Sequence, residues 1–198
     1  RLSEYKIQLS NDNNKDLQVI IPAKTFIEVT KIFSTENNNI EIFKSTDENL
    51  LIFKSEDILV ATRILDGNYP DYKRVIPTDF NLTANFSLTE FEDAVKKTNI
   101  FAKETDGSTI KLKFDPVEKQ IVISSQAEVS GENQSIIAAD IDGDLLEASF
   151  NSKYLLDFCT NFKVENITLK TNSATSPFLF LSEEDKNYLH LVMPLQTF

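Results

Sequence analysis

Few side chains in this chain of 198 residues have the types and spacing that catalysis needs. His190 is the single histidine and lies in an apolar stretch without a visible nucleophile partner, which favours a packed histidine over a general base. The segment Asp140–Asp144 (DIDGD) lacks the spacing and the glutamate of a calcium-binding loop, so a turn is expected there. Asp66 and Asp71 could serve a hydrolase in principle, but no pattern places them across a cleft.

Metal and cofactor signals are equally weak. Cys159 lies on the apolar side of a helical pattern, so we expect a buried, inert thiol and a reducing compartment, the cytoplasm. No Cys/His cluster indicates zinc, and no glycine-rich phosphate loop occurs. No apolar run approaches the roughly 20 residues needed to span a bilayer. The sequence therefore predicts no catalytic residue, no metal, no cofactor and no membrane association.

The elements that position these residues follow a pattern that occurs three times. A short apolar strand leads into an amphipathic helix, and three more short strands follow; the copies begin at Leu17, Asn81 and Leu145. Helices on one face of antiparallel sheets indicate an α+β fold of repeated βαβββ units. Because one such unit cannot cover its own sheet, each needs a mate. Three units therefore predict one and a half domains of a larger repeating protein.

Local signals place the three helices. Ser87 and Glu90 form a capping box, Asn151 or Ser152 supplies a second N-cap, and Pro22 stands near the start of the first helix. Apolar residues then recur with helical spacing. The expected stripes are Phe26, Val29, Ile32 and Phe33 in the first helix, Phe91, Val95 and Phe101 in the second, and Leu155, Phe158, Cys159 and Phe162 in the third.

The net charge of −11 by itself argues against binding to nucleic acid. The distribution of charge matters more than its sum, however, because lysines recur in all three helices. Lys24 and Lys31 are seven residues apart, as are Lys96 and Lys103, so each pair shares a helix face. An ordinary solvated surface is the favoured interpretation of these faces. The lysines concerned are Lys24, Lys31, Lys96, Lys97, Lys103, Lys153 and Lys163.

Four motifs together carry a resemblance to a known family. They are DGNYPDYKRVIP at Asp66–Pro77, FNSKYLLD at Phe150–Asp157, VMPL at Val192–Leu195, and the opening pair Arg1-Leu2. The first motif also fits a rigid linker, because its prolines fix φ. It equally fits one wall of a binding groove, and both interpretations can hold together. With these motifs the whole chain resembles the bacterial sliding clamp, the beta subunit of DNA polymerase III.

The resemblance implies an architecture. A subunit of this family contains six βαβββ units paired into three domains, and two subunits close head to tail around duplex DNA. Residues 1–77 would be the second half of the middle domain, and residues 78–198 the C-terminal domain. Ile100 and Phe101 match the subunit-interface position, with Ile100 favoured as the exposed partner. The chain alone is expected to be a monomer or a non-native assembly, and the full-length protein a homodimeric ring.

The resemblance also implies a function: a non-catalytic processivity factor of DNA replication. Its partners would be double-stranded DNA, bound without sequence preference through helix lysines such as Lys97, and proteins that dock short peptides. These proteins are the DNA polymerase III alpha subunit, the clamp loader and repair polymerases. The groove carried over by motif comprises Arg1, Leu2, Pro70, Arg74, Val75, Asn151, Tyr154, Ser176, Leu191, Met193, Pro194 and Leu195.

Two departures and two alternatives accompany this interpretation. Gln196 stands where many family members carry Arg, and Thr197-Phe198 extends past the usual end, where Phe198 could cover the groove. The first alternative is an unrelated α+β protein-interaction domain with similar repeats. The second is a hydrolase that uses surface carboxylates.

Overall fold

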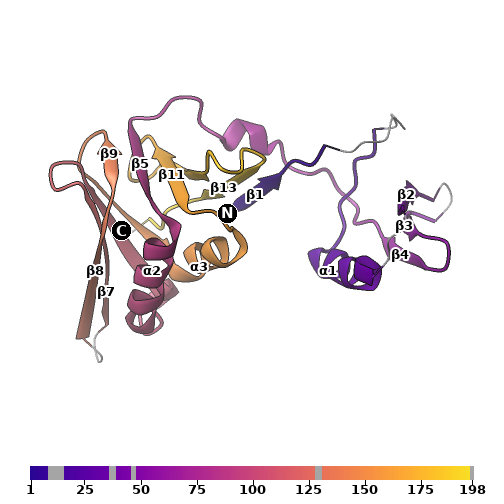
Figure 1. The fold of residues 1–198 in the computed structure, drawn as a ribbon, viewed down its shortest axis with the longest axis horizontal. Helices are drawn as coiled ribbons and strands as arrows, with labels where there is room; N and C mark the ends of the chain where they lie inside the picture. The colour runs from indigo at the N-terminus through magenta and orange to yellow at the C-terminus, as the bar shows by residue number, and fades with distance from the viewer. Residues whose placement is uncertain (9–15, 36–38, 46–47, 128–130, 197–198) are drawn as a thin grey trace. The chain divides into compact units, whose positions relative to one another are not determined.

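The repeated strands and helices are arranged in two units (Figure 1). The structure is a computed structural model and describes residues 1–8, 16–35, 39–45, 48–127 and 131–196. The first unit contains residues 1–8 and 72–198, and the second contains residues 9–71. The extension Thr197-Phe198 lies outside the described residues.

In the repeats that begin at Asn81 and Leu145 the helices and strands follow the expected order, and all strand pairings among the described residues are antiparallel. The α-helices in the described ranges are α1 (Ala23–Ile32), α2 (Leu88–Ala102) and α3 (Ser152–Asn161). The strands of the second unit are β2 (Glu41–Lys44), β3 (Leu50–Lys54) and β4 (Leu59–Arg63). Those of the first unit are β1 (Leu2–Tyr5), β5 (Leu82–Ser87), β6 (Thr109–Asp115), β7 (Gln120–Ala127), β8 (Gly131–Ala138), β9 (Asp140–Asp142), β10 (Leu146–Asn151), β11 (Asn166–Thr171), β12 (Phe178–Leu181) and β13 (Tyr188–Val192).

The first unit contains two of the βαβββ repeats, called modules below, which begin at Asn81 and Leu145. The two modules exchange their first strands. β5 belongs by sequence to the module of β6–β8, yet it pairs with β11 of the other module. Reciprocally, β10 pairs with β6, which gives the sheets β1-β13-β12-β11-β5-β9 and β10-β6-β7-β8. Figure 1 shows β5 beside β11, and α2 and α3 next to each other. Each module thus completes the sheet of its mate, as the repeat predicts for units that cannot cover themselves.

The helix signals are confirmed in this unit. The Ser87 hydroxyl accepts a hydrogen bond from the Glu90 amide at 3.4 Å, and the Asn151 side chain accepts one from the Lys153 amide at 3.0 Å. Both caps satisfy amides that the first helical turn leaves without partners. The predicted stripe of α3 is buried throughout. In α2, Phe91 and Val95 are buried, whereas Phe101 is only partly buried.

Phenylalanine side chains fill the core between the sheets and helices. Phe150 and Phe178 meet edge to face with ring centroids 4.8 Å apart, and Phe158 lies 4.7 Å from Phe180. Such pairs add roughly 0.5–1.5 kcal/mol beyond the burial of their area. The same cluster packs the first strand of each module against both helices, so the unit has one continuous core.

The strand β1 is not part of the predicted repeat. It adds to the edge of the larger sheet by pairing with β13, with Leu2 opposite Leu191 and Tyr5 opposite Tyr188. Nearby, hydrogen bonds from Lys6 and Tyr72 hold the pKa of Glu4 below its usual value. The N-terminal residues are therefore fixed to the last strand described, although nearly the whole chain separates them.

The second unit differs from the prediction at its first strand. We expected Leu17–Ile21 to form a strand, but these residues belong to no strand, and the expectation was wrong. The physical reason is the exchange seen in the first unit, where a module's first strand pairs with another module's sheet. The stripe of α1 is buried only at Val29 and Phe33; Phe26 and Ile32 are exposed.

One glycine gives a sharp test of the fold. We expect Gly143→Ala to destabilise the first unit by on the order of 1–3 kcal/mol, because Gly143 has φ +130° and a Cβ there would lie 2.4 Å from the Asn81 carbonyl oxygen. Gly67→Ala is the control for strain alone, since Gly67 has φ +133° and open space around it. Thermal unfolding of both variants is the measurement. Equal losses in the two variants would contradict the close approach of Gly143 to Asn81.

Candidate functional site

The candidate groove begins where β13 ends. Leu191 is buried in that strand, whereas Met193 and Leu195 beyond it are exposed. The Leu195 amide donates a hydrogen bond of 2.7 Å to the carbonyl of Ser149 in β10, which holds the chain against the smaller sheet. The C-terminal segment thus presents apolar side chains on a backbone that is fixed at both ends.

Arg1 forms the next part of this surface. Its guanidinium lies over the ring of Tyr154, 4.6 Å from the ring centroid, and forms an ion pair with Asp157. A cation over an aromatic face is attracted by the ring's charge distribution. Because Leu2 is opposite Leu191, residues from β1, α3 and β13 come together here. Sequence reasoning named these residues by motif but did not predict the contact between Arg1 and Tyr154.

Asn151 and Ser176 shape the loops around Leu195. The Asn151 side chain caps α3 and also donates a hydrogen bond of 2.6 Å to the Gly107 carbonyl. The Ser176 hydroxyl shares a hydrogen bond of 2.8 Å with Ser173. A hollow of about 400 Å³ lies beside the end of this segment, with Leu195 in its lining. Asn151 therefore has a structural role that explains its place in the motif.

The remaining groove candidates come from the Asp66–Pro77 motif. Arg74 and Val75 lie in a short 3₁₀ helix, Tyr72–Val75, with Val75 exposed. The Tyr72 hydroxyl donates a hydrogen bond to Glu4 in β1, and so fixes this helix to the edge of the larger sheet of the first unit. Pro70 is exposed and belongs to the second unit.

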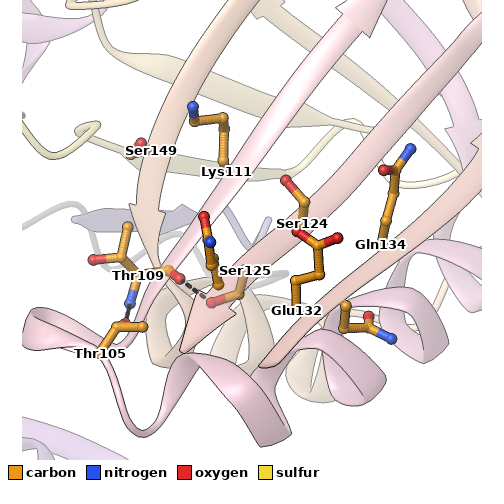
Figure 2. Close-up of a pocket in the computed structure, with 10 residues that line it drawn as sticks. Thr105, Thr109, Lys111, Ser124, Ser125, Glu132, Gln134 and Ser149 are labelled. Carbon is orange, nitrogen blue, oxygen red and sulfur yellow. Dashed lines mark hydrogen bonds between the residues drawn. The ribbon is translucent and has the colours of Figure 1, made fainter. Parts of the chain in front are cut away.

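A second hollow, of about 410 Å³, was not indicated by the sequence. It lies where β6, β7 and β8 meet the turn after α2 (Figure 2). Figure 2 shows Ser125 hydrogen-bonded to the Thr109 carbonyl at 2.9 Å, and the Thr109 amide donates to the Thr105 hydroxyl at 2.8 Å. Most of the residues that line it carry hydroxyl or amide groups, and only strand pairing brings them together.

The candidate DNA-facing lysines are all exposed. Lys96 and Lys97 lie opposite the buried stripe of α2, on its solvent face. Lys96 forms an ion pair with Glu92 at 2.8 Å, which raises the pKa of Lys96, and Lys31 pairs with Glu28 at 3.0 Å. Internal carboxylates therefore compensate part of this positive charge, and Lys97 has no ion pair among the described residues.

The candidate subunit interface lies at the end of α2. Ile100 is 67% exposed although it is a large apolar residue. The Thr98 hydroxyl donates a hydrogen bond of 2.9 Å to Asn133, which ties this part of α2 to β8. β8 is the outer strand of its sheet and presents an exposed Ile136. Exposed Ile100 thus lies on a helix turn fixed to an open sheet edge.

The residues with catalytic types are packed in the core. His190 is buried, stacks on Phe158 at 5.0 Å, and shares a hydrogen bond of 2.7 Å between its Nδ1 and Ser3. Burial and the charge of Arg1 lower the pKa of His190 to about 4. Burial raises the pKa of Cys159 to about 12. These positions agree with the predicted packed histidine and buried thiol.

The acidic segment Asp140–Asp144 also contributes to the fold, through the larger sheet. Asp140–Asp142 form β9, which pairs with β5, and the chain turns at Gly143. In the ranges that the structure describes, no three His, Cys, Asp or Glu side chains are grouped as a metal site would require. No helix in those ranges is long and apolar enough to cross a membrane.

Comparison with known protein families shows to which family the chain belongs. Residues 73–196 match the family model described as DNA polymerase III beta subunit, C-terminal domain, and residues 1–71 match the model of its central domain. The chain belongs to the DNA polymerase III beta subunit family. The resemblance stated from the sequence motifs is thereby confirmed.

Individual relatives agree with this assignment. A protein of Streptococcus pneumoniae named beta sliding clamp is 33% identical over 201 residues, and its namesake in Bacillus subtilis is 29% identical over 198 residues. Both matches include all of this chain and about half of the relative, 51% and 52%. The chain thus spans about half the length of the curated relatives that it matches.

Solved structures confirm the fold. The crystal structure of the DNA polymerase III beta chain from Streptococcus pneumoniae has a TM-score of 0.90 at 30% identity, over 98% of this chain and 51% of that one. The DNA polymerase sliding clamp of Bacillus subtilis also has a TM-score of 0.90, at 29% identity, over 99% and 51%. The α+β clamp fold of repeated βαβββ units is therefore established.

Proposed function

We propose that this chain is part of a sliding clamp, a non-catalytic processivity factor that encircles duplex DNA and tethers the replicative polymerase. Membership of the beta-subunit family is the observation that carries this proposal. The family relationship favours the bacterial cytoplasm as its location. In this proposal residues 1–77 are the second half of the middle domain, and residues 78–198 are the C-terminal domain.

The proposed docking site for partner peptides is the groove defined from the motifs. An apolar rim at Met193 and Leu195 lies close to the buried Leu191 and to a rigid β10–α3 junction. A flexible thioether suits a pocket that must accept several apolar anchors. The proposed occupants are short segments of the DNA polymerase III alpha subunit, the clamp loader and repair polymerases.

The groove is tested with Met193→Ala. We expect peptides that carry a Gln followed by spaced Leu or Phe residues to bind about 5- to 150-fold more weakly to the variant, equivalent to roughly 1–3 kcal/mol for a lost anchor contact. Isothermal titration calorimetry measures the affinity. Ile136→Ala removes an exposed apolar side chain on β8 and serves as the matched control. Equal peptide affinity for Met193→Ala and the wild type would exclude Met193 from the site.

The proposed interaction with DNA uses phosphates and not bases. A clamp that slides needs positive groups along the backbone of the duplex and no base readout. The candidate positions are the exposed helix lysines, with Lys97 the strongest because, unlike Lys96, it lies on the solvent face of α2 without an ion pair among the described residues.

Salt dependence tests this interaction. We expect weak binding of this chain to any duplex, with affinity falling as salt rises, and Lys97→Ala should reduce the slope of log affinity against log salt by about 1. Fluorescence anisotropy with two unrelated duplexes gives the slopes. Lys186→Ala, which changes a loop lysine paired with Glu183, is the control. Tight binding to only one of the two sequences would contradict a sliding function.

The proposed ring is a homodimer joined head to tail. Ile100 supplies an exposed apolar contact near the open edge of β8, and partly buried Phe101 supports it from the core side. An open edge strand presents unpaired backbone groups that a second subunit can complete.

A further inference from the structure

Lys111 in β6 lies at the border between the two hollows of the first unit. The hollow beside Leu195, called the terminal hollow below, also has Lys111, Ser149 and Gln196 in its lining. The hollow of Figure 2 shares Lys111 and Ser149 with it, so the two hollows adjoin. Among the described residues that line them, Lys111 is the one with a positive charge. A negatively charged ligand of either hollow therefore has Lys111 as its counter-charge.

Strand pairing places Lys111 level with the end of the candidate groove. Leu195 is bridged to Ser149 in β10, and Ser149 is directly opposite Lys111 in β6. Neighbouring strands lie about 4.8 Å apart, so the Cα atoms of Leu195 and Lys111 are separated by about 10 Å. An extended chain advances about 3.3 Å per residue. A peptide anchored on Leu195 therefore brings a residue about two or three positions from its anchor to Lys111.

The ammonium of Lys111 lies on the side of the terminal hollow. Its Nζ is 3.8 Å from a carboxylate oxygen of Glu147, which lines the terminal hollow and not the other one. Figure 2 shows the amine directed away from Ser124, Glu132 and Gln134. A separation of 3.8 Å is too long for a hydrogen bond. The ammonium can therefore donate hydrogen bonds to a ligand in the terminal hollow.

The charges around Lys111 leave it less compensated than its neighbours. The residues directly opposite Lys111 on the two adjacent strands are Ser149 and Ser124, and both are neutral. Glu147, in contrast, is directly opposite a second lysine, Lys113. Charges of opposite sign stabilise each other most when they are directly opposite. The positive charge of Lys111 is thus the one available to a carboxylate that enters the hollow.

We propose that Lys111 selects docked peptides that carry an acidic side chain beside their apolar anchors, and that this carboxylate binds in the terminal hollow. The inference rests on the proposed peptide groove and adds a chemical feature of its partners. A hydrogen bond between an ammonium and a carboxylate is charge-assisted and stronger than a neutral one. The Gln196 amide and the Thr175 hydroxyl, which also line the hollow, can donate further hydrogen bonds to the same carboxylate.

Paired peptides test the selection. The parent peptide carries a Gln followed by spaced Leu or Phe residues, and Asp or Asn is placed at one of the three positions before or after the anchors. For one of these positions we expect the Asp peptide to bind the wild-type chain about 3- to 10-fold more tightly than its Asn counterpart. Isothermal titration calorimetry in about 50 mM salt measures both affinities, because higher salt screens an exposed charge pair.

Neutralisation of one lysine identifies the group responsible. Lys111→Gln should reduce the ratio of Asp to Asn affinities to about 1, and Lys111→Glu should reverse it. The Lys111 side chain is 56% exposed, so neither change disturbs the core. Lys113→Gln is the matched control, since it removes the same charge from the same face of β6 at a residue that lines neither hollow. This control should retain the wild-type ratio.

Glu147→Gln gives an effect of opposite sign. It removes the carboxylate that competes for the Lys111 ammonium, so the preference for the Asp peptide should rise by a further factor of about 2 to 3. A merely structural role of Lys111 would not produce this increase.

The outcomes separate this inference from the proposed function. Equal affinity for every Asp and Asn pair, with the parent peptide still bound, would overturn the role of Lys111 and leave the groove in place. A preference that persists in Lys111→Gln, or that Lys113→Gln also abolishes, would likewise overturn it. Failure of the parent peptide to bind the wild-type chain would overturn the proposed groove, and the selection by Lys111 with it.

Discussion

Phe91→Ala is expected to destabilise the first unit by about 3–5 kcal/mol, the usual cost of removing a fully buried phenylalanine. Phe91 packs against two strands of the larger sheet that come from different modules, with ring centroids 5.1 Å from Phe86 in β5 and 6.5 Å from Phe180 in β12. Loss of its ring leaves a cavity between elements that belong to different modules. Amide hydrogen exchange of β5 and β11 measures the effect on this unit alone, and it should accelerate at least about 100-fold.

Val117→Ala is the control for this substitution. Val117 is 85% exposed at the turn between β6 and β7, and truncation there should change stability by no more than about 0.5 kcal/mol. Exchange rates for Phe91→Ala equal to those for Val117→Ala would show that the core does not depend on Phe91.

Acidification is expected to destabilise the first unit through His190. Burial, with the nearby charge of Arg1, lowers the pKa of His190 from 6.5 to about 4. Between these values the unfolded chain binds the proton and the folded chain does not, so unfolding becomes more favourable as pH falls. The contribution is complete above about pH 6.5 and is lost progressively toward pH 4, amounting to about 3 kcal/mol.

A comparison with His190→Gln isolates this effect from the titration of carboxylates. In urea unfolding between pH 4 and 7, the free energy of unfolding should fall more steeply with decreasing pH for the wild type than for the variant. Altered packing in the variant shifts its free energy of unfolding by a constant amount and does not change this slope. Because the chain has a single histidine, NMR titration assigns its signal directly. A folded-state pKa near 6.5 would rule out the buried neutral ring.

Sequence patterns were sufficient where an element is stabilised locally. Ser87 caps α2 as predicted, and the stripe from Leu155 to Phe162 is buried. In both cases the signal lies within a few turns of one helix. The α+β class and the order of strands in the second and third modules follow from the same local periodicity.

Sequence patterns failed where a distant partner decides the outcome. Leu17–Ile21 has the composition of a buried strand, but composition does not supply the neighbouring sheet that such a strand requires. β1 is the opposite case. Its four residues were not predicted as a strand, and they form one because β13 provides their partner. For the candidate groove, motifs named Arg1 and Tyr154, whereas their contact depends on that pairing.

The exchange of first strands has a consequence for synthesis on the ribosome. β5 is made before β11, and about 80 residues separate them, which at translation rates of 5–20 residues per second corresponds to roughly 4–16 s. β10 meets no such delay, because β6 precedes it. The nascent chain therefore holds β5 without its partner while the second module emerges, and β1 waits for β13, which follows all the other strands of the described residues.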